Sequence, residues 1–146
     1  LLARHFHVSL YSNDSHEVLE NVEQCGYADY SAVMPRVFKA SGINLNITLR
    51  TIQSGIPLRC FDIMGCGGFL LTNYQSELLD YFEDGRELAI YESVGDAYEK
   101  AEFYLKHDEE RIKIARRGYE AVKEKFTFDG QLKKMFAVAS LTAGGA

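Results

Sequence analysis

Residues 55–73 read Gly55-Ile-Pro-Leu-Arg-Cys-Phe-Asp-Ile-Met-Gly-Cys-Gly-Gly-Phe-Leu-Leu-Thr-Asn73. The opening Gly-Ile-Pro is a turn signal, and the glycines that follow Met64 mark the end of a helix. The apolar spacing between these signals predicts a helix over residues 58–64, and the run 69–72 predicts a short buried strand. The expected core contacts of the helix are Leu58, Phe61 and Met64. A turn, a helix, a second turn and a buried strand in this order favour a layered α/β domain.

The chain before this stretch contains further strand-like segments and one short helix. The segments with strand-like composition are 7–12, 27–33 and 43–48. A helix is expected from Met34 to about Ala40, because Pro35 falls in its first turn, where a missing N–H costs nothing. Residues 16–24 fit neither pattern.

The chain after it begins with a loop and a helix over residues 73–82, then a strand at 88–91. The residues expected to point inward from that helix are Leu78, Leu79 and Phe82. From Ser93 the pattern is helical, and Asp96 three residues later forms an imperfect capping box with it.

Two apolar stripes follow along the helical part of the chain. They consist of Ala97, Ala101, Tyr104 and Leu105, and of Ile112, Ala115, Tyr119 and Val122. A last helix is expected over 131–141, and the tail 142–146 carries no pattern and is expected to fray. Short strands alternating with helices predict one α/β domain over residues 1–146, with a mostly parallel sheet and a helical C-terminal third. That third either packs on the sheet or reaches a partner domain.

Composition narrows the function classes. The 146 residues carry 16 Lys and Arg against 21 Asp and Glu, a net charge of −5, which disfavours nucleic acid as a partner. The densest basic stretch, Arg111 to Arg117, is interleaved with apolar residues and is interpreted as a solvated helix face. No apolar run approaches the roughly 18–20 residues that span a membrane.

The three cysteines Cys25, Cys60 and Cys66 indicate neither a disulfide framework nor a zinc site, because no partner stands at the required spacing. Cys60 and Cys66 are expected to be small core residues in a reducing, cytoplasmic compartment. The chain opens without Met at Leu1, and we expect it to be part of something longer.

Two loops are placed to bind a ligand, because ligands of open parallel sheets lie beyond the carboxyl ends of the strands. The first runs from Ser54 to Asp62 and the second from Thr72 to Glu77. The second leads into a helix N-terminus, whose free N–H groups suit phosphate. Thr72, Asn73 and Ser76 would add donors there, although Asn73 or Ser76 can equally cap the helix. Gly67-Gly68 permits close approach of a ligand to the backbone, or simply a helix stop and a tight turn.

Arg59 and Asp62 are the charged residues of an otherwise apolar run, and they share a helix face. One interpretation is a surface ion pair, which contributes little. The other is that Arg59 faces a diphosphate, for which its planar fork is suited, while Asp62 accepts hydrogen bonds from ribose hydroxyls. The spacing does not distinguish the two interpretations.

The stretch from Tyr27 to Phe128 resembles the C-terminal domain of CgeB-like, spore-maturation-type glycosyltransferases, within the glycosyl transferases group 1. The sequence segments that carry the resemblance are Tyr30-Ser-Ala-Val-Met-Pro-Arg-Val-Phe-Lys39, Ile43-Asn-Leu-Asn-Ile-Thr48, Gly55 to Asn73, Glu77-Leu78 and Phe126-Thr-Phe128. Together they cover about two-thirds of the chain, in the expected order.

The resemblance implies a GT-B architecture, in which two Rossmann-like domains face a cleft and the C-terminal one binds the nucleotide-sugar donor. The expected fold is therefore a Rossmann-like parallel sheet flanked by helices. The expected ligand is a UDP- or GDP-linked sugar, and no metal is needed because side chains and helix dipoles offset the diphosphate charge.

The resemblance also implies roles for individual residues. Asp62 stands where related transferases usually carry a Glu that holds the donor ribose, and the loop from Asn73 to Glu77 approaches the diphosphate and the sugar. The residues expected to line the donor site are Arg59, Asp62, Gly67, Gly68, Thr72, Asn73, Tyr74, Glu77, Asn46 and Lys39. Asn44 and Asn46 share a face of an extended segment, where their amides line the cleft or satisfy buried backbone groups. Lys39 either reaches a phosphate or is an ordinary surface lysine.

The sequence departs from the family in three places. Ser54 stands where many relatives carry an earlier Glu, eight residues before the ribose carboxylate, and Gln131 stands where an Arg is common. The resemblance also leads us to expect that the first strand and the N-terminal acceptor domain lie outside this sequence. No catalytic residue is identified. We therefore expect this chain alone to bind donor weakly or not at all, and not to transfer sugar.

Two other functions remain open at the level of sequence. The first is a non-catalytic structural or interaction module that retains the fold, and it stays open because Ser54 replaces the earlier Glu of the family. An unrelated flavodoxin-like binding domain would need a phosphate loop after the first strand, for which residues 12–15 are a weak candidate.

Overall fold

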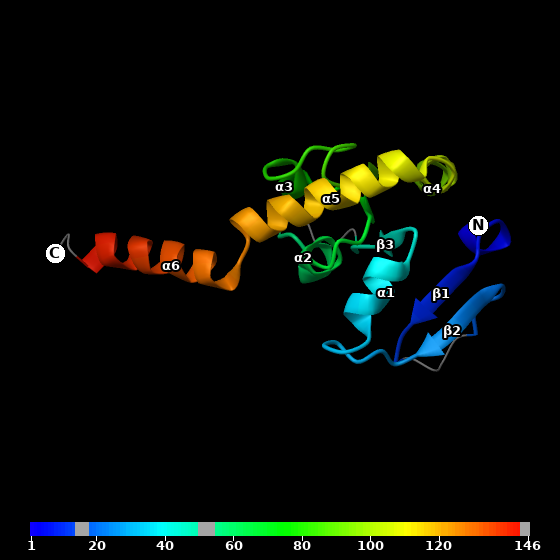
Figure 1. The fold of residues 1–146 in the computed structure, drawn as a ribbon, viewed down its shortest axis with the longest axis horizontal. Helices are drawn as coiled ribbons and strands as arrows, with labels where there is room; N and C mark the ends of the chain where they lie inside the picture. Colours follow the sequence, from blue (N-terminus) through cyan, green and yellow to red (C-terminus); the bar gives the residue numbers. More distant parts are fainter. Residues whose placement is uncertain (14–17, 50–54, 144–146) are drawn as a thin grey trace.

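The computed structural model describes residues 1–13, 18–49 and 55–143 (Figure 1). Its elements, in chain order, are η1 (Leu2–Arg4), β1 (Val8–Tyr11), β2 (Val22–Gly26), α1 (Met34–Ala40), β3 (Asn44–Asn46), α2 (Leu58–Gly65), β4 (Leu70–Asn73), α3 (Ser76–Leu79), β5 (Ala89–Tyr91), α4 (Val94–Lys106), α5 (Asp108–Lys125) and α6 (Phe128–Ala143).

All pairings between these strands are parallel. Strands β3, β4 and β5 form one sheet in that order, with Asn46 beside Thr72 and Thr72 beside Ile90. Strands β1 and β2 form a separate pair. In Figure 1 this pair lies beyond the β3 edge of the sheet, and β1 is nearer to β3 than β2 is. The expected α/β fold with parallel strands flanked by helices is confirmed.

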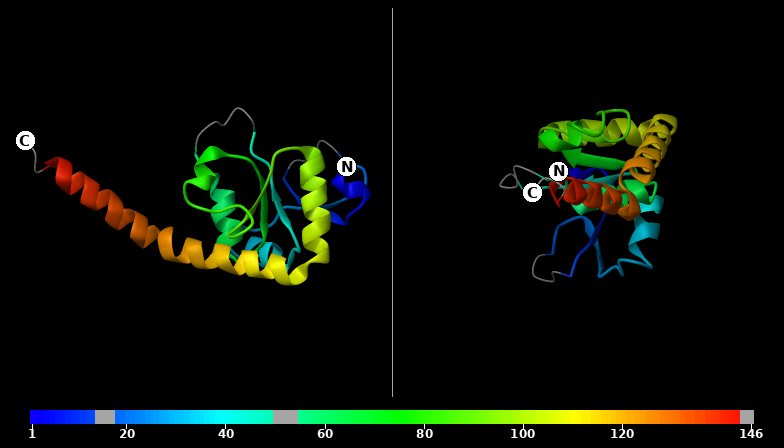
Figure 2. Two further views of the ribbon diagram at one scale, coloured as in Figure 1. Left: turned by 90° about the horizontal axis from the view of Figure 1, so that it is seen from above. Right: turned by 90° about the vertical axis from the view of Figure 1, so that its left-hand side faces the viewer.

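Alternate residues of a strand point to opposite sides, and strands β4 and β5 are buried on both faces of the sheet. Leu70 and Ile90 join the cluster that includes the apolar side of α2, whereas Leu71 and Tyr91 join the cluster against α4. Helix α5 contributes to both clusters (Figure 2). The hydrophobic core therefore includes the helix predicted at 58–64 and the strand predicted at 69–72.

The expected cap of α4 is confirmed. The Asp96 backbone N–H donates to Ser93 Oγ at 3.1 Å, and Asp96 Oδ2 accepts from the Glu92 N–H at 2.9 Å. The Ser93 hydroxyl thus satisfies one donor that the first turn of a helix leaves open, while Asp96 bonds the residue before the cap.

The strand expected over 27–33 is wrong, and the strand β2 lies just before it. Residues 30–33 form a turn instead. Asp29 Oδ1 accepts from the N–H groups of Ser31 and Ala32 at 3.0 and 2.6 Å, and the Asp29 carbonyl accepts from Val33. Such local bonds compete with strand pairing, and here they lead the chain into α1.

Several residues expected inside are exposed. They are Leu58 (78%), Leu79 (46%), Leu105 (40%), Ile112 (62%) and Tyr119 (38%). On α5 the buried face runs through Ile114, Ala115, Gly118 and Val122, so the expected burial of Ala115 and Val122 is confirmed. At Gly118 an added Cβ would overlap the carbonyl oxygen of Glu87, so the helix lies directly against the chain entering β5. For α5, the expected burial of Ile112 and Tyr119 is wrong. The many charged residues of this helix leave more than one of its faces compatible with burial.

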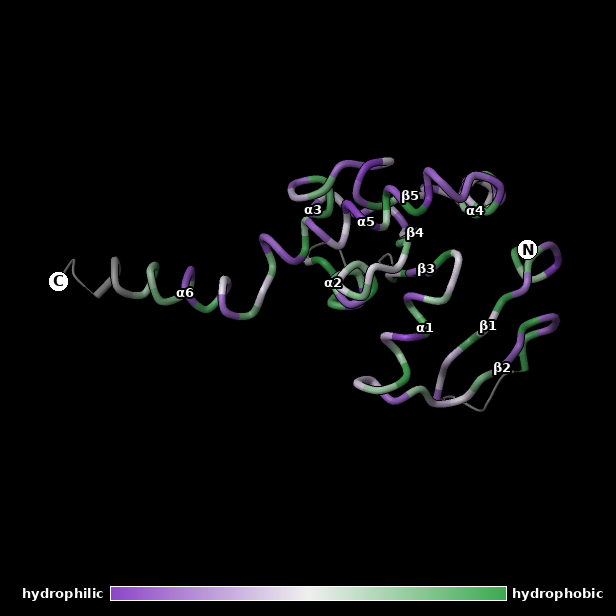
Figure 3. The backbone as a smooth tube through the Cα atoms, viewed as in Figure 1, coloured by the Kyte–Doolittle hydropathy of each residue, from purple (hydrophilic) through white to green (hydrophobic). Residues whose placement is uncertain are grey.

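The last helix, α6, begins at Phe128 rather than 131 and projects away from the body (Figures 1 and 2). It alternates hydrophilic and hydrophobic residues along its length (Figure 3). Of the tail expected to fray, residues 142–143 belong to α6 and 144–146 lie outside the described residues. Within the described part of the chain, no helix combines the length and apolarity needed to cross a membrane.

Candidate functional site

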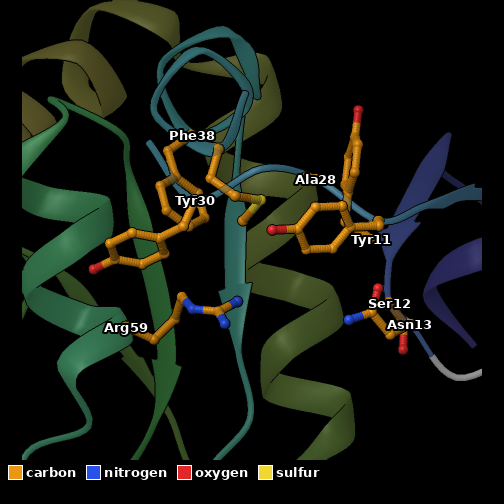
Figure 4. A pocket seen from close by; sticks show the side chains of 9 residues that line it. Tyr11, Ser12, Asn13, Ala28, Tyr30, Phe38 and Arg59 are labelled. Carbon is orange, nitrogen blue, oxygen red and sulfur yellow. The ribbon is translucent and has the colours of Figure 1, made fainter. Parts of the chain in front are cut away.

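A pocket of about 330 Å³ lies where the β1–β2 pair meets α1 and α2 (Figure 4). Its lining residues are Tyr11, Ser12, Asn13, Tyr27, Ala28, Tyr30, Met34, Phe38 and Arg59. Tyr11 ends β1, residues 12–13 follow it and residues 27–28 follow β2, so the pocket lies at the carboxyl ends of these strands. That is where ligands of parallel α/β sheets bind.

Arg59 contributes the positive charge of this pocket. It lies in the first turn of α2, with its guanidinium 5.9 Å from the ring centroid of Phe38, and it forms no ion pair within the described part of the chain. In Figure 4 the guanidinium and the Tyr11 hydroxyl both point towards the open space. A cation held over an aromatic face keeps its N–H donors available to an anion.

Asp62, one turn further along α2, has a different partner. Its Oδ1 accepts from the hydroxyl of Tyr30 at 2.7 Å, and this bond raises the pKa of Tyr30 above its ordinary value. Of the two interpretations of Arg59 and Asp62, the mutual ion pair is wrong. The Tyr30 hydroxyl points away from the pocket towards α2 (Figure 4), and Asp62 itself is not among the residues that line the pocket.

Asn44 and Asn46 are structural rather than cleft-lining. The Asn44 amide donates to the carbonyls of Phe38 and Phe69 at 2.9 and 3.3 Å. Asn46 Nδ2 donates to the hydroxyls of Thr48 and Thr72 at 3.1 and 3.0 Å. These two amides and Thr72 are buried, so their side chains satisfy one another and the backbone, as buried polar groups must.

Side chains of the loop after β4 form hydrogen bonds with backbone groups of neighbouring segments of this chain. The Asn73 amide bonds the backbone of Thr48 with both of its polar atoms, at 2.7 and 3.2 Å. Glu77 Oε2 accepts from the backbone N–H of Gly55 at 2.7 Å. The expectation that Asn73 or Ser76 caps α3 is wrong, since the N-cap is Gln75 and no side chain accepts there.

Gln75 is a residue that sequence reasoning missed. It is 9% exposed, and its Oε1 has no hydrogen-bond partner in the structure. An unpaired buried acceptor costs about 1–3 kcal/mol. No local signal distinguishes this glutamine from an ordinary loop residue, because only the fold buries it.

Gly67 and Gly68 serve the turn after α2. Gly67 has φ +75°, which favours glycine, and a Cβ on Gly68 would stand 2.6 Å from the Phe38 carbonyl oxygen. The close approach is therefore to α1 and not to an open surface. Tyr74 and Lys39 are exposed and do not line the pocket.

The aromatic wall of the pocket was also missed as a site. Tyr11, Tyr27 and Tyr30 are 16 and three residues apart in the chain and meet only through the pairing of β1 with β2 and the turn at Asp29. The signal available in the sequence was a tyrosine directly at or after each of two strand ends. Ser54 and two residues of the candidate loop 12–15, Asp14 and Ser15, lie outside the described residues.

The cysteines near this region are unsuited to nucleophilic chemistry. Burial raises the pKa of Cys60 to about 11, against a smaller lowering by its hydrogen bond with Thr72. Burial also raises the pKa of Cys66. Across residues 1–13, 18–49 and 55–143, no group of three or more His, Cys, Asp or Glu is placed to hold a metal ion.

Comparison with known proteins gives two matches. Residues 2–137 match the family model described as glycosyl transferase-like. The chain is also similar to the spore protein CgeB of Bacillus subtilis (strain 168), with 34% identity over 91 residues. That alignment covers 62% of this chain and 27% of the relative, so the chain spans about a quarter of the relative's length.

Proposed function

The chain belongs to the glycosyl transferase-like family, and on that premise we propose that it carries the nucleotide-sugar donor site of a glycosyltransferase. The donor would be a UDP- or GDP-linked sugar. The acceptor and any general base would come from a further domain, since the chain spans 27% of its relative. Free thiols at Cys25, Cys60 and Cys66 suit a reducing, cytoplasmic setting.

The observation that carries the proposal is the placement of Arg59. Among the residues that the structure describes, the guanidinium has no carboxylate partner, and it lies in a pocket at the carboxyl ends of parallel strands, which suits a phosphate group. Its position in the first turn of α2 adds the positive end of the helix dipole. Tyr11 and Tyr27 add aromatic surface against which a flat base or a sugar can pack.

These groups suggest a division of labour along α2. Arg59 would bind the diphosphate, and Asp62, one turn away, would accept hydrogen bonds from the ribose hydroxyls. When the sugar leaves, the diphosphate gains negative charge, and a fixed cation stabilises that charge most in the transition state. Arg59 would therefore serve both donor binding and the chemical step.

A second candidate function is a non-catalytic module that retains the fold. Two observations favour it: Asn46, Thr72 and Asn73 are all engaged by the protein itself, and the similar relative is named only as a spore protein. In that case the pocket would be a remnant without affinity for nucleotides.

Calorimetric titration of the full chain with UDP, GDP and their sugars separates the two functions. A donor site predicts saturable binding that falls at least about tenfold in Arg59→Gln, since a charged hydrogen bond contributes about 1.5–3 kcal/mol. Arg116→Gln is the matched control, because Arg116 is exposed and pairs only with Glu120 among the described residues. Absence of binding by any of these nucleotides, even in the full-length parent protein, would sink the donor proposal and favour the module.

A further inference from the structure

Tyr30 is held in place by the turn that precedes α1. Asp29 fixes this turn through bonds to Ser31, Ala32 and Val33. The ring of Tyr30 lines the pocket on one side, while its hydroxyl reaches across to α2, 32 residues later in the chain. A side chain that starts from a hydrogen-bonded turn and bonds a second element can fix the position of the group that it touches.

The group it touches is one oxygen of the Asp62 carboxylate. Oδ1 accepts the Tyr30 hydroxyl at 2.7 Å, and no other hydrogen bond or ion pair to this carboxylate occurs among the residues that the structure describes. Arg59, the nearest cation on the same helix, lies over Phe38 instead. Oδ2 and the second lone pair of Oδ1 are thus left for a ligand.

We propose that Tyr30 is a positioning residue, which holds Asp62 in the orientation that accepts the 2′- and 3′-hydroxyls of a donor ribose. The proposal rests on the donor function proposed above and adds to it the group that sets ribose selectivity. An unrestrained aspartate would lose rotamer freedom on binding, and the tyrosine removes that cost in advance. Tyr30 itself need not touch the ribose.

The test measures affinity of the full chain for UDP and GDP and for their 2′,3′-dideoxy counterparts. In Tyr30→Phe, the ribonucleotide that the wild type binds should weaken about fivefold, as expected for one hydrogen bond. Its dideoxy counterpart should change less than about twofold, because it offers Asp62 nothing to bind. Tyr119→Phe is the matched control: Tyr119 is exposed on α5 and does not line the pocket, so its variant should leave both affinities unchanged.

A double-mutant cycle separates positioning from packing. In an Asp62→Ala background, Tyr30→Phe should cause no further loss, because the carboxylate it positions is gone. Equal weakening of ribose and dideoxy ligands, or additive losses in the cycle, would overturn the positioning role while leaving the donor function intact. Binding by the wild type with no effect of Tyr30→Phe would do the same. No binding by the wild type, even in the full-length parent protein, would overturn both proposals. The variant keeps the exposed ring, and its thermal melt reports whether the fold is intact.

Discussion

Asn73 bonds the backbone of Thr48 with both polar atoms of its amide: Oδ1 accepts from the N–H at 2.7 Å, and Nδ2 donates to the carbonyl at 3.2 Å. The side chain thereby continues the pairing of β3 with β4 beyond the last strand residues. It also ties the loop after β4 to the segment that follows β3. Asn73 is also one of the residues that the family resemblance predicts to line the donor site.

Replacing Asn73 tests which role it has. Asn73→Ala should lower the free energy of unfolding by about 1–3 kcal/mol, because two bonds to part-buried backbone groups are lost. Urea denaturation measures this change. Ser76→Ala in the same loop is the control and should stay within about 0.5 kcal/mol, since no side chain caps α3. An unchanged stability with a large loss of nucleotide affinity would instead assign Asn73 to the ligand.

Gly118 should not tolerate a side chain. Gly118→Ala is expected to destabilise the protein by about 1–3 kcal/mol, because its Cβ would overlap the Glu87 carbonyl oxygen and approach Met64. Gly95→Ala is the control on α4, where the added Cβ meets only Ser93 Oγ at 3.8 Å. That variant should be neutral or gain up to about 1 kcal/mol from helix propensity. Thermal or urea unfolding of both variants gives the comparison, and equal effects would contradict the close packing of α5.

The bond between Tyr30 and Asp62 should make part of the stability depend on alkaline pH. The bond raises the pKa of Tyr30 in the folded state, so its stabilising effect is fully present below the ordinary tyrosine pKa of about 10. It is lost as pH rises through the folded pKa. The stability difference between wild type and Tyr30→Phe should therefore stay constant from neutral pH to about pH 10 and shrink above it. Urea unfolding at a series of pH values measures the difference, and a gap that does not shrink above about pH 10 would argue against the bond.

The three cysteines should differ in reactivity. Cys60 is 0% exposed and its pKa is raised to about 11, so iodoacetamide at pH 8 should leave it unmodified in the native protein. Cys25 is partly exposed on the β1–β2 pair and should be alkylated first. Peptide mass spectrometry with and without denaturant identifies the sites. Rapid native labelling of Cys60 would mean that α2 is not packed on the sheet as described.

Periodicity determined the fold class, because the helix at 58–64, the strand at 69–72 and the helix at 34–40 depend on contacts between near neighbours and on turn residues within the same stretch. The same sequence segments carry the resemblance to the family, whose model matches residues 2–137. Asp62 and Arg59 could be named as candidates because they are charges in an apolar run.

Only the tertiary structure decided what those candidates contact. Tyr30 and Asp62 are 32 residues apart, and Asn73 and Thr48 are 25 apart, so neither pair has a local signature. The buried face of α5 depends on which elements lie against it, and charged residues leave several phases possible. Strand β2 was overlooked because its residues are stabilised by pairing with β1 rather than by their own pattern. Local propensity therefore fixes which elements form, whereas the partners of buried polar groups follow from chain segments that only packing brings together.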